Sequence, residues 1–211
     1  MRKWIPAGLI AAAWVISLAV FERLPERVPT HWGISGQVDG WSSRTFGAFA
    51  LPALMLMIWG LCYWLPAIDP RRGNYAKFRG TYDIVVAAIL GFMLIVHVAI
   101  LAVSLGVNVP IPVVISLAVG MMLVLVGNLL PRARPNWFFG IRTPWTLSSD
   151  RVWDRTHRLG GRMMVVAGLI IAVSGFAPPP WPGILIGVAA AGAAVVPIVY
   201  SYIIWREDKR G

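Results

Sequence analysis

Residues 111–130 read IPVVISLAVGMMLVLVGNLL and contain no charged side chain. A helix of about 20 apolar residues is long enough to cross the roughly 30 Å hydrocarbon core of a bilayer. This stretch therefore predicts a transmembrane helix, and it defines what to look for on either side of it.

Five further segments share this composition. Hydrophobic residues make up 58% of the 211-residue chain and charged residues only 13%, a balance typical of a membrane protein. We predict an all-α integral membrane protein forming a single membrane domain over residues 1–211. Its six transmembrane helices are expected at residues 4–21, 46–65, 82–105, 111–130, 163–177 and 184–205.

The basic residues are distributed unevenly between the two sides of this predicted bundle. Of the 19 Lys and Arg, all but Arg23, Arg27 and Arg44 lie on one side. Basic loops are retained in the cytoplasm, so both ends of the chain are predicted to be cytoplasmic in a multi-pass inner-membrane protein. The net charge of +10 then belongs to a rim facing anionic headgroups. Membrane lipids are thus expected partners, and direct binding of nucleic acid is not expected.

The outer connection, residues 22–45, is longer than a helical hairpin requires. Its prolines and glycines, including the Asp39-Gly40 pair, predict an ordered extracytoplasmic loop rather than a free linker. Trp32 and Trp41 suit the boundary between membrane and water. His31 and Asp39 could form an acid–base or metal site, but one histidine without cysteine is a poor ligand set, so no metal or cofactor is expected.

The cytoplasmic connection, residues 131–162, has an irregular aromatic half and a helical half. Ser148 or Ser149 can cap a helix on which four arginines form one stripe. This pattern predicts an amphipathic segment at the membrane interface. The alternative is that the basic face, with Trp153 and His157 four residues apart, is a docking surface for a cytoplasmic protein.

Several shorter features have structural interpretations. Residues 69–81 are expected to form a simple basic turn, and Arg79 is expected to neutralise Asp83. His97 is interpreted as a hydrogen-bonded packing residue rather than part of a proton relay. The series Gly183, Gly187, Ala191 predicts close helix packing.

Two stretches resemble the SdpI family of bacterial membrane proteins. The outer stretch contains LP at 24–25, PTHW at 29–32, Gly36, DG at 39–40 and Arg44. The inner stretch contains GN at 127–128, NWFFGIRTPWTLS at 136–148, VW at 152–153 and THR at 156–158. With six helices as well, the resemblance covers nearly the whole chain.

This resemblance implies a function in immunity and signalling. The best-understood member of the family protects its bacterium against a secreted, membrane-active toxin peptide, and in signalling it holds a cytoplasmic ArsR-like repressor at the membrane. By this resemblance the residues facing the toxin are His31, Trp32, Gly36, Asp39 and Trp41. The inner, partner-binding set is Asn128, Asn136, Gly140, Arg142, Thr143, Trp145, Trp153 and His157.

Two other functions stay open at this point. A small-molecule or lipid transporter needs polar groups near the middle of the membrane, where His97 stands out. A membrane-embedded enzyme needs a catalytic constellation, for which the candidates are His31 with Asp39, or Asn128 with Arg142 and His157. We predict that the protein is not an enzyme.

Overall fold

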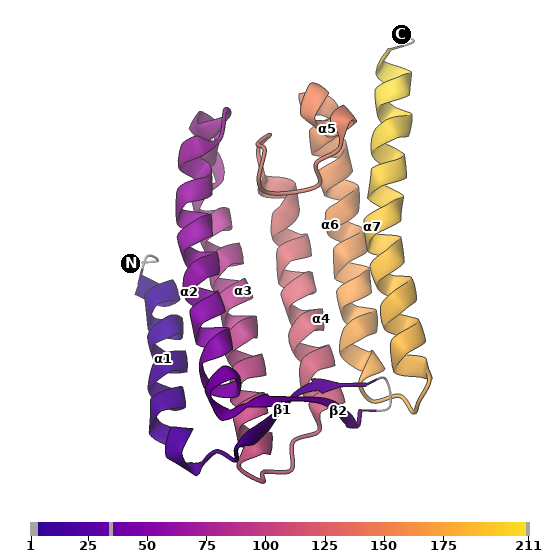
Figure 1. Ribbon diagram of the computed structural model, residues 1–211. Helices are drawn as coiled ribbons and strands as arrows, with labels where there is room; N and C mark the ends of the chain where they lie inside the picture. The colour runs from indigo at the N-terminus through magenta and orange to yellow at the C-terminus, as the bar shows by residue number, and fades with distance from the viewer. Residues whose placement is uncertain (1–3, 34–35, 210–211) are drawn as a thin grey trace.

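The computed structural model is a bundle of long helices with a small β-hairpin across one end (Figure 1). The structure describes residues 4–33 and 36–209. Six helices in these ranges are long and apolar enough to cross a membrane: α1 (Trp4–Val20), α2 (Arg44–Ile68), α3 (Tyr75–Ser104), α4 (Ile111–Leu129), α6 (Asp150–Ser174) and α7 (Trp181–Asp208). The predicted six-helix membrane fold is confirmed.

The helices lie in two groups beside each other (Figure 1). In one group, α1, α2 and α3 enclose a core that includes Ile10, Met55 and Leu90. In the other, α4, α6 and α7 pack around Ala167, Ile171 and Ala189. Many large apolar side chains of both groups point outward and are exposed. Such a surface is unsuited to water and matches the hydrocarbon of a bilayer.

Glycines bring α4 and α6 into direct backbone contact. A Cβ atom built on Gly120 would lie 2.5 Å from the carbonyl oxygen of Gly168, and one on Gly127 would lie 2.6 Å from that of Gly161. The converse also holds, since Cβ atoms on Gly168 and Gly161 would meet the carbonyls of α4 at 2.6 and 2.5 Å. Small residues allow this approach in membrane helices, and any side chain here would push the pair apart.

The glycine series predicted to pack α7 does not do so. Gly183 and Gly187 are exposed, and a Cβ on Gly187 would meet nothing within 4 Å. The prediction was wrong because fourfold spacing shows that small residues share a face, but not which way the face points.

Two helices begin earlier than their apolar segments suggested. α3 starts at Tyr75 rather than at residue 82, and it has a kink at Phe78, where φ is −133°. α6 is one continuous helix that includes both the predicted amphipathic segment and the fifth transmembrane segment. The side chain of Ser149 caps it by accepting a hydrogen bond from the N–H of Val152, at 3.3 Å.

The described residues of the outer loop, 22–33 and 36–45, are ordered, as expected, and they contain a structure that was not expected. Strand β1 (Arg27–Trp32) pairs antiparallel with β2 (Val38–Ser43). Val28 is fully buried against Gly47, where a Cβ would lie 2.5 Å from its Cγ1. The hairpin therefore packs on the start of α2 and crosses the helix ends toward α4 (Figure 1). We call this end of the bundle the hairpin end and the opposite end the loop end.

The loop end carries the connection from α4 to α6. It comprises the 3-10 turn η3 (Leu130–Arg132), an irregular stretch and the short helix α5 (Pro144–Ser148). The 3-10 turn η2 (Arg72–Asn74), between α2 and α3, lies beside it; at the hairpin end η1 (Phe21–Arg23) follows α1. The two longest connections, after α1 and after α4, thus lie at opposite ends of the bundle.

Candidate functional site

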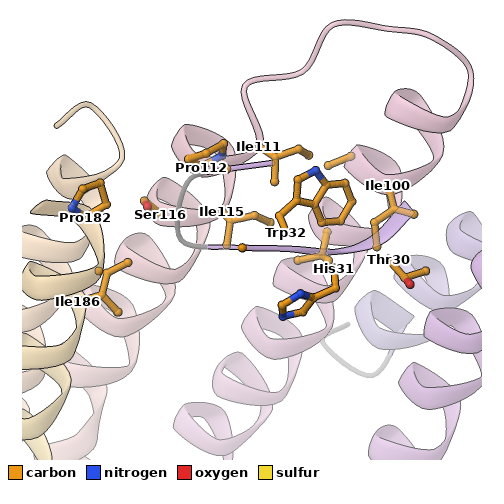
Figure 2. A pocket seen from close by; sticks show the side chains of 15 residues that line it. Thr30, His31, Trp32, Ile100, Ile111, Pro112, Ile115, Ser116, Pro182 and Ile186 are labelled. Atoms are coloured by element: carbon orange, nitrogen blue, oxygen red, sulfur yellow. The ribbon is translucent and has the colours of Figure 1, made fainter. Parts of the chain in front are cut away.

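A cavity of about 400 Å³ lies at the hairpin end, between the hairpin and the ends of α3, α4 and α7. Figure 2 shows the indole of Trp32 beside Ile100 and Ile111, with Pro182 and Ile186 supplying the wall on α7. The lining is mainly apolar. Ligand sites in proteins are typically cavities of this size with few polar groups. We call it the hairpin cavity.

The rim of the hairpin cavity carries a polar pair. The imidazole Nδ1 of His31 is hydrogen-bonded to the carboxylate of Asp39 on the facing strand, and the two form an ion pair when His31 is protonated. The two side chains are 72% and 52% exposed, so the pair adds little to stability. The imidazole lies on the opposite side of the strand from Trp32 (Figure 2). Polar groups thus face outward beside an apolar recess.

Glycines set the position of the hairpin. Gly40 lies opposite His31, and a Cβ on it would come within 2.7 Å of the histidine Cβ. Gly36 has φ +76°, and a Cβ there would lie 2.9 Å from Cγ of Pro112 on α4. Of the five predicted ligand-facing residues, His31, Trp32 and Gly36 line the cavity, whereas Asp39 and Trp41 are not part of its lining, and Trp41 is 53% exposed.

The histidine inside the membrane is a packing residue, as predicted. His97 is fully buried, and its Nε2 lies 2.8 Å from Oγ of Ser17. Ser17 donates its proton to the carbonyl oxygen of Ala48 at 2.6 Å, so the imidazole is the donor to Ser17. His97 therefore ties α3 to α1, and through Ser17 to α2. The neighbouring prediction also holds, since Arg79 pairs with Asp83 at 3.1 Å.

At the loop end a buried carboxylate holds the connection in place. Asp69 is 2% exposed and accepts hydrogen bonds from the N–H of Arg71 at 2.7 Å, the N–H of Trp137 at 2.8 Å and the hydroxyl of Tyr75 at 3.0 Å. A carboxylate with three donors is well satisfied despite its burial. It joins the end of α2 to the start of the irregular stretch.

Asn136 organises the irregular stretch itself. It is fully buried, and its Oδ1 accepts from the N–H groups of Phe138 at 3.0 Å and Phe139 at 2.6 Å. Its Nδ2 donates to the carbonyls of Arg134 at 2.8 Å and Phe139 at 2.9 Å. The hydroxyl of Tyr75 also lies 3.1 Å from Oδ1, although its single proton can serve only Asn136 or Asp69 at one time. One side chain therefore replaces the regular backbone pairing that this segment lacks.

Trp153 and His157, both on α6, pack against the irregular stretch and hydrogen-bond to its backbone. Both are fully buried, and their rings stack with centroids 4.0 Å apart. The indole donates to the carbonyl of Ala133 at 2.9 Å, and Nε2 of His157 accepts from the N–H of Ile141 at 3.0 Å. Nδ1 of His157 donates to the carbonyl of Trp153 at 2.8 Å, so these partners select the neutral ring. This overturns the alternative of a docking surface formed by the two rings, because the connection folds back over them.

Gly140 and the following residues close the connection. Gly140 has φ +110°, and any Cβ on it would collide with His157. Thr143 caps α5 through a reciprocal pair of bonds with Thr146. Its hydroxyl also lies 3.1 Å from Oγ of Ser201 on α7. Trp145 packs on Tyr202 of the same helix with ring centroids 5.0 Å apart.

Two residues of the predicted inner set, Arg142 and Asn128, are exposed and lie outside this buried network. Arg142 is exposed and donates to the carbonyl of Trp137 at 2.9 Å. Asn128 is exposed on α4 and bonds only its own helix, at the carbonyl of Val124. No hydrogen bond joins Asn128, Arg142 and His157 within the described residues: the first two are exposed, whereas His157 is fully buried. Nor do three His, Cys, Asp or Glu side chains gather as a metal site in residues 4–33 and 36–209.

The connection from α2 to α3 was expected to be a simple turn, and its role was missed. Besides Asp69 and Tyr75, it supplies Arg71, which donates to the carbonyl of Leu147 at 3.0 Å and pairs with Asp150 at 3.3 Å. Asn74 donates to the carbonyl of Pro135 at 2.8 Å. The one sequence signal of this role was Asp69, an acidic residue directly after an apolar segment in an otherwise basic connection.

The chain has identifiable relatives. The model of the SdpI/YfhL protein family matches residues 132–201, and a domain of unknown function, DUF1648, matches residues 8–56. Immunity protein SdpI of Bacillus subtilis strain 168 is 27% identical over 199 residues, which is 94% of this chain and 93% of the relative. The chain resembles the SdpI/YfhL protein family over residues 132–201. No solved structure matches it.

The two matched segments contain the two long connections of this chain, that after α1 and, from residue 132 on, that after α4. Residues 8–56 include the hairpin with Trp32, and residues 132–201 include the stretch around Asn136, α5 and the α6–α7 pair. Its similarity to this family and the six apolar helices identify a multi-pass protein of the bacterial cell membrane.

Proposed function

We propose that this protein protects a bacterial cell against a secreted, membrane-active toxin peptide that binds at the hairpin cavity. The Bacillus subtilis relative is named an immunity protein. The observation that carries the proposal is the position of the cavity, which lies under a structured hairpin at the end of the bundle that the charge distribution predicts to be extracytoplasmic.

The chemistry of the cavity fits an amphipathic peptide. Its apolar walls can bury one or two large side chains, each worth about 1.5–3 kcal/mol when removed from water. Trp32 offers a large aromatic surface and an indole N–H. On the exposed rim, His31 and Asp39 offer hydrogen bonds and charge to a peptide backbone or a polar side chain.

Helices that line the cavity also reach the loop end. α3 carries Ile100 at the cavity and Tyr75 at the loop end, while α7 carries Ile186 at the cavity and Ser201 against Thr143. A toxin that binds one arrangement of α3 and α7 more tightly than another would shift the population of loop conformations. We propose that one such conformation holds a cytoplasmic ArsR-like repressor at the membrane.

Survival of toxin-sensitive cells tests the protective function. Cells expressing the wild-type protein are challenged with a panel of secreted antimicrobial peptides, beside Trp32→Ala and the matched control Trp41→Ala, which removes a hairpin tryptophan outside the cavity. We expect wild type and the control to protect and Trp32→Ala to fail at equal membrane levels. Equal protection by all three proteins would exclude the hairpin cavity as the toxin-binding site. No protection by the wild-type protein against any peptide of the panel would contradict the immunity function.

Recruitment of a repressor needs its own measurement. A small ArsR-like repressor encoded beside the gene, fused to a fluorescent protein, should move to the membrane when toxin is added to wild-type cells. In cells carrying Asn136→Ala it should remain in the cytoplasm while the hairpin cavity is intact. Recruitment by both proteins would show that the loop conformation is not what the repressor recognises.

A further inference from the structure

A groove follows the membrane-facing seam between α4 and α6. Its part near the loop end has a volume of about 420 Å³ and is lined by Arg158, Arg162 and Asn128, with Pro131, Val165 and Val166. Its second part, of about 500 Å³, is lined by apolar side chains that include Val124, Leu125 and Leu169. Asn128 lines both parts, so the groove is continuous from a basic end to an apolar end.

The groove has the length of one lipid leaflet. Arg158 lines its basic end and Ala172 its apolar end, and both belong to α6. A helical rise of 1.5 Å per residue separates these two positions by about 21 Å. Half of a bilayer, with its headgroup region, is roughly 20–22 Å thick.

The charges at the basic end have no partner among the described residues. Arg158 and Arg162 lie one helical turn apart and are both exposed. Neither forms an ion pair or a hydrogen bond with any described residue, whereas Arg151 on the same helix pairs with Asp208 at 2.9 Å. Two neighbouring guanidinium groups repel each other unless an anion lies between them, and phosphate oxygens fit their planar donors.

We propose that this groove binds one anionic phospholipid. The phosphate lies between Arg158 and Arg162, the amide of Asn128 faces the headgroup region, and an acyl chain follows the apolar part toward Leu169. A second copy of the chain is a poorer occupant, because symmetric parallel pairing on this face would bring four arginines together. The site is separate from the hairpin cavity and does not depend on the proposed immunity function.

Native mass spectrometry of the full-length protein, released from detergent, tests the proposal. The protein is incubated with phosphatidylglycerol or with zwitterionic phosphatidylcholine, and retained lipid is measured. We expect one phosphatidylglycerol to be retained preferentially. The double variant Arg158→Gln/Arg162→Gln should bind it about 30-fold less tightly, while Arg155→Gln, which removes an exposed arginine of the same helix outside the groove, should bind normally.

Two further measurements distinguish binding of a whole lipid from binding of its headgroup alone. Leu125→Trp fills the apolar part from an exposed position, so it should reduce lipid binding without loss of folding. Glycerol phosphate, which has the headgroup chemistry alone, should not displace the lipid at equal concentration. Equal losses for Arg155→Gln and the double variant, displacement by glycerol phosphate, or protein dimers in place of the lipid adduct would each overturn the proposal.

Discussion

Replacing Asn136 with alanine should open the connection at the loop end without unfolding the bundle. The substitution leaves the N–H groups of Phe138 and Phe139 without their acceptor in a partly buried setting. Each unsatisfied donor costs about 1–3 kcal/mol. At about 1.4 kcal/mol apiece, the two reduce the free energy of opening by about 2.8 kcal/mol, which corresponds to about 100-fold faster opening-limited exchange.

Hydrogen–deuterium exchange of the amides in residues 137–141 measures this effect in purified protein. Asn128→Ala is the matched control, because it removes the same side chain from an exposed site where it bonds only its own helix. We expect fast exchange in Asn136→Ala, wild-type exchange in the control, and unchanged exchange in α4 and α6 for both. Wild-type exchange in Asn136→Ala would refute the assignment of Asn136 as the organiser of this connection.

Three further substitutions have defined outcomes. Gly120→Leu should lower the thermal unfolding temperature in detergent by forcing α4 and α6 apart at a cost of about 1–3 kcal/mol, while Gly187→Leu, which has open space, should leave it unchanged. Gly40→Val should break the hairpin, because its Cβ would come within 2.7 Å of the opposite strand; faster amide exchange confined to β1 and β2 would show this. His157→Phe should lose about 1–3 kcal/mol of stability by leaving the N–H of Ile141 unpaired, and His157→Gln should recover part of it in the same denaturation assay.

The transmembrane part of the fold was predictable because burial in lipid imposes a composition that can be counted. Residues 111–130 showed this directly, and α4 occupies Ile111–Leu129. The start of α3 was less accessible, because Lys77 and Arg79 interrupt the apolar pattern although the helix continues through them. The hairpin was missed because Pro29 and the glycines of the loop indicate turns, while its strands depend on packing against Gly47.

The candidate sites were predictable as sets of residues but not as contacts. The aromatic stretch was recognised, yet its partners Asp69 and Tyr75 are 68 and 61 residues away from Trp137 and Asn136. A spacing of four placed Trp153 and His157 on one face of a helix, but only the fold shows that the connection covers this face. Sequence periodicity defines a face, whereas tertiary structure decides what it contacts.

The backbone contact between α4 and α6 also bears on how the protein is made. α6 is the least apolar of the six helices, since it carries four arginines and two aspartates in its first half. A helix of this composition gains comparatively little from lipid alone when it leaves the translocon. Its partner α4 precedes it in synthesis, and the two glycine pairs allow α6 to dock on a helix already in the bilayer. We therefore expect correct membrane integration of the C-terminal third to depend on four residues that have no side chain, Gly120, Gly127, Gly161 and Gly168.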